Sequence, residues 1–117
     1  DIYNTKVVRA SMSAIFEVKT VFADLCDIPK IKKMGYKIAG GALLPKTVNL
    51  YSANLEGKWA FVLGNEGDGI SEKMCELCDT LIKIPMPGGA ESLNVSVACA
   101  VMLYEYVRVN FEKEKTK

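Results

Sequence analysis

The stretches WAFVLGNEGDGIS (residues 59–71) and TLIKIPMPGGAESLN (residues 80–94) decide the fold of this 117-residue chain. Each starts with a short run rich in apolar, β-branched or aromatic residues, the pattern of a strand covered on both faces in a parallel sheet. Glycine or proline closes each run, so strands are expected at residues 59–63 and 80–84. The loop after each strand then lies where open α/β sheets place their ligands.

The rest of the chain alternates strand patterns with helix patterns. Further strands are expected at residues 19–23 (KTVFA, buried) and 36–39 (YKIA, stopped by Gly40 and Gly41), and helices at residues 6–16, 29–34, 71–78 and 92–111. Residues 42–57 are expected to form a connector with one helical turn, and the charged tail to be frayed. This alternation predicts an α/β fold, with a mostly parallel sheet flanked by helices and one domain over residues 1–117.

The charge balance argues against a strongly cationic protein. The chain has 15 basic and 14 acidic side chains and a net charge of +1, so any affinity for RNA must come from local clustering or from segments outside this sequence. No apolar run approaches the roughly 20 residues that span a bilayer. With no secretory signal ahead of its four cysteines, the chain is expected to be soluble and cytoplasmic.

The cysteines carry little sign of a metal or redox site. Cys75 and Cys78 form a C-x-x-C pair, but a structural zinc site usually needs a second pair or two histidines, and this chain has no histidine. We therefore predict no metal, and we expect buried, inert thiols.

Two loops carry the candidate chemistry. In the first, residues 64–69 (GNEGDG), three glycines allow positive φ and close approach of a ligand to the main chain; a simple tight turn is an equal alternative. The second, residues 84–94 (IPMPGGAESLN), runs into the longest helix, whose first main-chain N–H groups attract polar groups. Ser92 could merely cap that helix, whereas Asn94 is a poor helix former and should have a partner.

These motifs resemble a known family. LGNEGDGIS followed by IKIPMPGGAESLNVSVACAVMLYEYVR resembles the second and third signature motifs of the SpoU/TrmH branch of the SPOUT methyltransferases, and DIYNTKVVRASMSAIF resembles the segment before them. The resemblance spans nearly all of the chain. Two long motifs in the family's order are far more specific than either glycine loop alone.

The resemblance implies a fold and an activity. It implies a C-terminal deep trefoil knot, a homodimer in which the third-motif helix helps to form the interface, and S-adenosylmethionine bound bent in the knot. The activity implied is transfer of a methyl group to a ribose 2′-hydroxyl of rRNA or tRNA. The alternative is a non-catalytic knotted RNA-binding or assembly module; a nucleotide-binding or redox domain is disfavoured because no phosphate loop or paired metal ligands occur.

The resemblance also assigns site residues. The polar active-site positions correspond to Glu66, Ser92 and Asn94. The cofactor positions correspond to Ala39, Gly40, Gly41, Gly64, Gly69, Ile84, Met86 and Leu93. Asn94 and Ser92 would orient substrate and cofactor, and Glu66 would hold the loop or help to place a polar group; none of the three is assigned as the base.

The sequence departs from the family pattern in one respect. Family members carry a first motif with an arginine implicated in catalysis, which is absent here, and Arg9 should not be substituted for it. We therefore expect a domain that is truncated at its N-terminus, binds cofactor and methylates RNA poorly by itself. The whole assignment requires that the loops at residues 64–69 and 84–94 close around the same small molecule.

Overall fold

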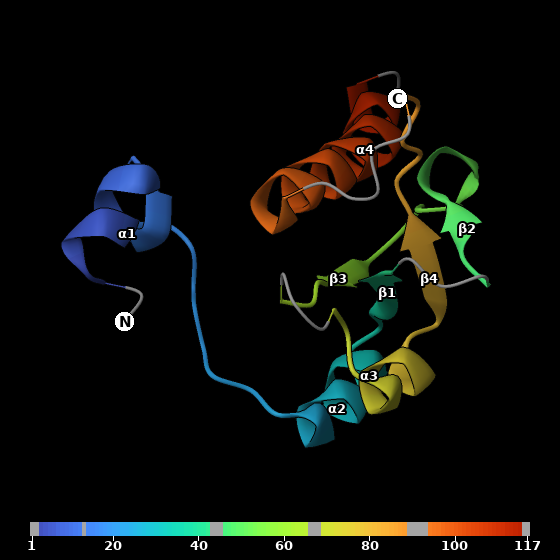
Figure 1. Cartoon of the computed structure of the whole chain (residues 1–117), viewed down its shortest axis with the longest axis horizontal. Coiled ribbons are helices and arrows are strands. Elements are labelled where there is room, and N and C mark those ends of the chain that lie inside the picture. Colours follow the sequence, from blue (N-terminus) through green and yellow to red (C-terminus); the bar gives the residue numbers. More distant parts are fainter. Residues whose placement is uncertain (1–2, 13, 43–45, 66–68, 89–93, 116–117) are drawn as a thin grey trace.

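A computed structural model describes residues 3–12, 14–42, 46–65, 69–88 and 94–115 of the chain. Its α-helices are α1 (Thr5–Ala10), α2 (Ile28–Lys33), α3 (Glu72–Leu77) and α4 (Val95–Lys115), and its strands are β1 (Lys37–Gly41), β2 (Val48–Asn49), β3 (Trp59–Val62) and β4 (Thr80–Lys83). Short 3₁₀ turns are η1 (Ala14–Phe16), η2 (Leu25–Asp27) and η3 (Leu50–Ser52). Figure 1 shows their arrangement.

The strands form one parallel sheet in the order β2-β4-β1-β3. In the centre, Gly40 of β1 is in register with Val62 of β3 and Leu81 of β4. The predicted parallel α/β class is therefore confirmed, as are the strands expected from residues 59–63 and 80–84. The expected connector at residues 42–57 does contain its helical turn, η3, but it also holds β2, whose two residues are too few to show a strand pattern.

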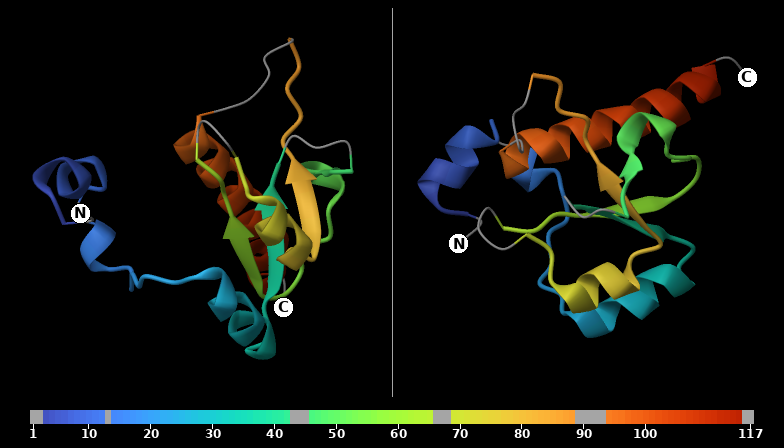
Figure 2. Two further views of the ribbon diagram at one scale, coloured as in Figure 1. Left: turned by 60° about the horizontal axis from the view of Figure 1, so that its bottom comes forward. Right: turned by 45° about the vertical axis from the view of Figure 1, so that its right-hand side comes forward.

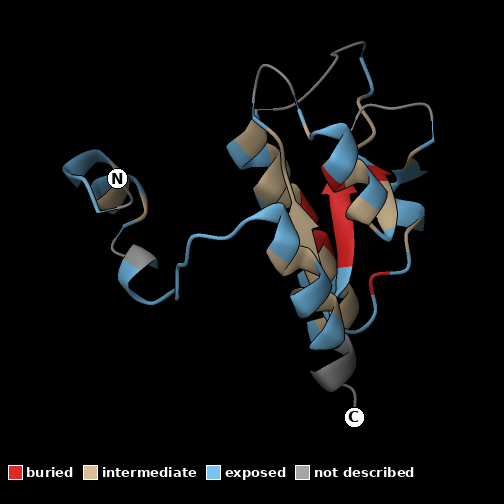
Figure 3. Ribbon diagram, turned by 90° about the horizontal axis from the view of Figure 1, so that it is seen from below, coloured by how far each residue is buried: buried red, intermediate tan, exposed pale blue. Residues whose placement is uncertain are grey.

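Helices cover both faces of the sheet. Helix α4 lies on one face and α2 and α3 lie on the other (Figure 1). Met102 of α4 packs with Ala39 and Ile82 in the main core cluster, which Leu50 and Leu55 complete. The buried residues gather on and around β1 (Figure 3). Burying these side chains supplies the hydrophobic free energy that holds the layers together.

Glycine in β1 serves packing, and the expectation that Gly40 and Gly41 stop this strand is wrong. Both are strand residues, and side chains alternate between the two faces. A Cβ on Gly40 would lie 2.8 Å from Cys78 Sγ, on the side of α3. A Cβ on Gly41 would lie 3.4 Å from Met102 Sδ, on the side of α4. Glycine here lets the helices approach the central strand closely.

The helix ends follow capping chemistry. The Ser71 hydroxyl accepts a hydrogen bond from Met74 N at 3.2 Å and starts α3, in agreement with the helix predicted at residues 71–78. Pro29 lies in the first turn of α2, and Gly35, at φ +96°, follows its end. Helix α4 begins at Val95, later than the predicted residue 92. The predicted helix over residues 6–16 is shorter, because α1 ends at Ala10 and Met12 has a φ of 51°.

The prediction of a buried strand at residues 19–23 is wrong. Figure 1 shows residues 3–24, the N-terminal arm, extending to one side of the sheet. Val21 is 82% exposed and Phe22 is 97% exposed, and no helix or strand is assigned over residues 19–23. A β-branched run becomes a strand only when a neighbouring strand can take up its backbone hydrogen bonds, and none of the described strands does so here.

Candidate functional site

The ends of three parallel strands define the candidate site. β1 ends at Gly41, β3 at Val62 and β4 at Lys83, and because the strands are parallel, the segments that follow them leave from the same edge of the sheet (Figure 2). Gly64 and Ile84, where the two predicted loops start, therefore lie on the same edge with the end of β1 between them. That the loops close around one ligand stays a prediction.

The first glycine loop returns on itself. Asn65 and Gly69 form an antiparallel bridge, in which Gly69 N donates to Asn65 O at 3.2 Å. Gly69 has a φ of +67°, as expected for a glycine turn, and a Cβ on Gly64 would overlap with the carbonyl carbon of Gly69. Two backbone segments therefore touch at Gly64, and no other residue fits there. The sequence motif gave no sign that Asn65 closes the loop, which its main-chain carbonyl does by pairing with Gly69.

The predicted cofactor residues of β1 lie at different depths. Ala39 is fully buried and belongs to the core, and Gly40 is buried beneath α3. Gly41 is half-buried at the strand end, where a Cβ would lie 3.9 Å from Val62 O. Of the three, Gly41 is thus the residue that borders the candidate site, and Ala39 and Gly40 form the packed layer behind it.

The second loop starts from a packed strand end. Ile84 is half-buried and packs against the core cluster, and Met86 is also half-buried. Asn94 stands directly before α4 and is exposed; its Oδ1 accepts from Ser96 N at 2.8 Å, and its main-chain carbonyl accepts from Ala98 N at 2.8 Å. The expected partner of Asn94 is therefore the first turn of α4. Predicted site residues Glu66, Ser92 and Leu93 lie outside the described residues.

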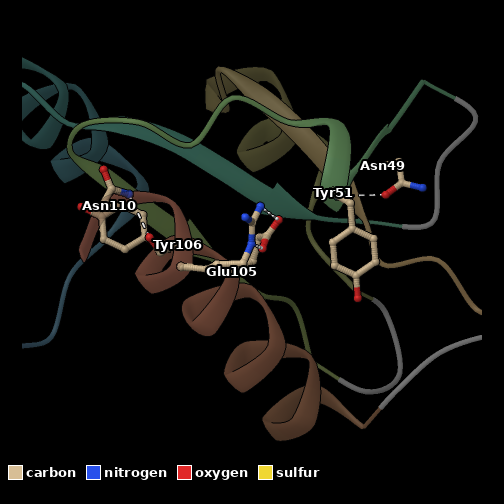
Figure 4. A network of polar contacts seen from close by, with 6 residues as sticks. Asn49, Tyr51, Glu105, Tyr106 and Asn110 are labelled. Carbon is tan, nitrogen blue, oxygen red and sulfur yellow. Dashed lines mark hydrogen bonds and ion pairs between the residues drawn. The ribbon is translucent and has the colours of Figure 1, made fainter. Parts of the chain in front are cut away.

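The other end of α4 is anchored by side chains. Asn110 Nδ2 donates to Leu55 O at 2.9 Å, and its Oδ1 accepts from Gly57 N at 3.0 Å. Tyr106 Oη donates to Gly57 O at 2.6 Å. Figure 4 shows these side chains together with the buried Glu105, whose Oε1 accepts a hydrogen bond from Arg108 Nε at 2.6 Å. These contacts fix α4 against the chain that leads into β3, and so help to hold the helix whose start borders the site.

The thiols are only partly as predicted. Cys75, Cys78 and Cys99 are half-buried, but Cys26 is exposed, so the expectation that all four are buried is wrong. Burial, followed by the neighbouring Cys75, raises the pKa of the Cys78 thiol and keeps it protonated at neutral pH. Within the described ranges there is no group of three or more metal-ligating side chains. No helix among these residues is long and apolar enough to cross a membrane.

These features define the class of protein: a parallel α/β domain with glycine-containing loops at the carboxyl ends of its strands. The family follows from comparison with known proteins. The model of the SpoU rRNA Methylase family matches residues 1–104, and the chain belongs to this family.

Individual relatives agree with this assignment. The 23S rRNA (guanosine-2′-O-)-methyltransferase RlmB of Xanthomonas campestris pv. campestris is 50% identical over 84 residues, which are 72% of this chain and 32% of the relative. The AdoMet-bound rRNA methyltransferase of Sinorhizobium meliloti superposes with a TM-score of 0.83 at 25% identity, over 92% of this chain and 42% of that one. The TrmH/SpoU tRNA modifying enzyme of A. aeolicus superposes with a TM-score of 0.76 at 31% identity, over 97% of this chain and 56% of that one. The chain thus spans about a third of the length of the curated relative.

Proposed function

We propose that this domain transfers a methyl group from S-adenosylmethionine to a ribose 2′-hydroxyl of rRNA or tRNA. The observation that carries the proposal is the common edge on which β1, β3 and β4 end, each followed by one of the segments that match the family. Relatives named as rRNA 2′-O-methyltransferases and a solved relative with bound AdoMet support the reaction and the cofactor.

The described residues fit a bound cofactor of this kind. At Gly69 a Cβ would meet nothing within 4 Å, so the main chain there has no side-chain cover and a flat heterocycle can approach it. Gly64, whose Cβ position is filled by the Gly69 backbone, would contribute main-chain atoms only. Gly41, Ile84 and Met86 add apolar surface at the ends of the neighbouring strands. Ala39 and Gly40 support this surface from behind, and Leu93 completes the proposed set. S-adenosylmethionine would supply an electrophilic methyl group on a positively charged sulfur.

The polar residues would act by positioning. Methyl transfer needs the ribose oxygen in line with the methyl group, so holding that geometry accounts for much of the acceleration. Asn94, at the start of α4, would orient the substrate or cofactor together with Ser92, and Glu66 would hold the glycine loop. None of the three is proposed as the base that accepts the hydroxyl proton.

A homodimer through α4 is part of the proposal. Val97, Tyr104 and Phe111 recur every seven residues along α4 and are 48, 73 and 53% exposed, and Ala100 and Val107 lie between them on the same stripe. An apolar stripe at this spacing is the pattern of a helix that packs against another helix. A second copy would bring the same stripe, which suits a two-fold symmetric interface. Sedimentation equilibrium at micromolar concentration tests this; a monomer would contradict it.

A trefoil knot and a cytoplasmic location are also proposed. The knot rests on similarity to the SPOUT family, and the location on the reduced thiols expected from the sequence. Pulling the chain by its two ends in optical tweezers tests the knot, because a knotted chain stays shorter than its full contour length. Localisation of a fluorescent fusion tests the second proposal.

Two measurements test the activity. Calorimetry with S-adenosylmethionine should show saturable binding, and transfer of a tritiated methyl group to total RNA should give alkali-stable 2′-O-methylated nucleotides. Absence of binding at millimolar S-adenosylmethionine would contradict the proposal. Binding without transfer would support a non-catalytic module instead.

Asn94 offers a sharper test because its capping and positioning roles can be separated. Asn94→Asp retains a side-chain acceptor for Ser96 N and should preserve the start of α4, but it removes the amide N–H groups. Asn94→Ala removes both and should cost about 1 kcal/mol of stability. If Asn94 positions the reactants through its amide, both variants lose transfer. Full transfer by Asn94→Asp would show that Asn94 is only a cap.

A further inference from the structure

Lysines gather at the edge of the sheet opposite the candidate site. Lys33 ends α2, Lys37 begins β1 and Lys58 immediately precedes β3, and all three are exposed. Lys37 N donates to Lys58 O at 3.0 Å, so strands β1 and β3 start side by side. Lys30 and Lys32 of α2 belong to the same region, which we call the amino-edge lysine cluster.

Aromatic rings hold two of these lysines in place. The Lys58 ammonium lies 5.7 Å from the centre of the Tyr36 ring, and the Lys37 ammonium lies 5.7 Å from the centre of the Trp59 ring. Both distances are within the range of a cation–π contact. Such a contact leaves the positive charge of the lysine available to an anion. A lysine held over a ring loses less side-chain entropy when it binds an anion, so the cluster is partly preorganised.

The cluster has a charge surplus that the rest of the chain lacks. Asp27 pairs with Lys30 at 3.4 Å and Asp79 pairs with Lys32 at 3.5 Å. Glu56, two residues before Lys58 in the sequence, adds a third carboxylate, so five lysines and three acidic groups leave a surplus of +2. Because the whole chain carries only +1, the remainder is slightly acidic. The loops that follow β3 and β4 contribute to this with Glu66, Asp68 and Glu91.

We propose that the amino-edge lysine cluster binds the phosphate backbone of the RNA substrate, away from the nucleotide that is methylated. Ammonium groups spread over two strand starts and a helix end suit a polyanion with repeating charges better than one compact anion. Such contacts hold and orient RNA without reading its sequence. The inference rests on the proposed function, because it takes RNA as the substrate.

Two triple variants with equal net charge test the cluster. Lys33→Gln, Lys37→Gln and Lys58→Gln together remove it, and Lys6→Gln, Lys19→Gln and Lys73→Gln together remove three exposed lysines elsewhere. Each changes the net charge from +1 to −2. The probe is a fluorescein-labelled RNA hairpin of mixed sequence, titrated by anisotropy over a range of salt concentrations. Calorimetry with S-adenosylmethionine on both variants reports separately on the cofactor site, and circular dichroism on the fold.

The cluster variant should bind the hairpin roughly 10–100-fold more weakly. Its plot of log K against log salt should also be shallower, with the negative slope smaller in magnitude by about 2. The control variant should bind the hairpin about as tightly as the unaltered chain does, and both variants should bind S-adenosylmethionine with unchanged affinity. Equal losses in the two variants, no loss in the cluster variant, or no hairpin binding by the unaltered chain would overturn the inference. Equally tight, lysine-dependent binding of polyglutamate would point to an acidic protein instead and would also overturn it. If the unaltered chain bound the hairpin but not S-adenosylmethionine, the result would contradict the proposed function and not the role of the lysine cluster.

Discussion

Replacing Asn110 with alanine should lower the free energy of unfolding by about 2 kcal/mol. The side chain makes three hydrogen bonds: two donated from Nδ2, to Leu55 O and Tyr106 O at 2.9 Å each, and one accepted from Gly57 N at 3.0 Å. Such bonds contribute about 0.5–1.5 kcal/mol each, and water can replace part of this at the exposed Gly57. The estimate is therefore below the full sum.

Urea denaturation followed by circular dichroism measures this change directly. The midpoint should fall while the slope of the transition stays the same, because the same surface is exposed on unfolding. In a thermal scan the melting temperature should fall by roughly 8 °C, at about 4 °C per kcal/mol for a domain of this size.

Tyr106 supplies a graded comparison. Tyr106→Phe removes only the 2.6 Å hydrogen bond to Gly57 O, and it keeps the ring edge-on to Phe61 at 6.0 Å, so it should cost about 1 kcal/mol. Tyr51→Phe in η3 is the matched control, because Tyr51 is 62% exposed and lies outside the proposed α4 interface, and it should cost almost nothing. A loss below about 0.5 kcal/mol for Asn110→Ala, or a larger loss for Tyr106→Phe, would refute the view that this network anchors α4.

Three further predictions concern packing, thiol chemistry and assembly. Gly40→Ala should destabilise the chain by about 1–3 kcal/mol in urea denaturation, because the new Cβ would meet Cys78 Sγ at 2.8 Å. Gly41→Ala should cost less, because its Cβ would lie 3.4 Å from Met102 Sδ. Equal losses of stability in the two variants would contradict this packing. Iodoacetamide at pH 8 should alkylate the exposed Cys26 first and Cys78 last, as read by peptide mass spectrometry. The pKa of Cys78 is raised by burial above its ordinary 9.0, so the stability that depends on the neutral thiol is present below pH 9.0 and is lost as pH rises further. Cys78→Ser should flatten that alkaline loss, and an unchanged pH profile would argue against it. Tyr104→Lys should convert the proposed dimer to a monomer in sedimentation equilibrium, and a dimer that survives would move the interface away from this stripe.

The parts of the fold that could be read from the sequence are those whose neighbours lie close along the chain. The strands predicted at residues 59–63 and 80–84 form as β3 and β4, each one residue shorter, because an apolar run ended by glycine or proline is a signal contained in the run itself. Ser71 starts α3 because its hydroxyl needs only Met74 N, three residues away. Local chemistry is sufficient in each case.

The wrong or missing predictions about strands depend on partners distant in the sequence. The KTVFA run has the composition of a strand, but none of the strands in the described part of the chain pairs with it. Gly40 looked like the end of a strand, yet Cys78, far along the chain, requires glycine there. The two residues of β2 are a strand only because β4 pairs with them.

The candidate site divides in the same way. The common edge of the two loops follows from parallel strands and was predictable. The depth of the β1 residues was not, because only the packing of α4 and α3 shows that Ala39 is enclosed while Gly41 borders the edge. Asn94 was expected to have a partner, and the first turn of its own helix supplies it.

The extended stretch at residues 19–24 has a practical consequence for anyone who handles this protein. Proteases bind their substrates as extended chain, and this stretch is already extended and exposed, with Lys19 and Phe22 available to trypsin and chymotrypsin. Brief digestion should therefore cut between α1 and α2 before it cuts the sheet. The shortened product, which keeps β1 to β4 and α4, would be the natural starting material for crystals.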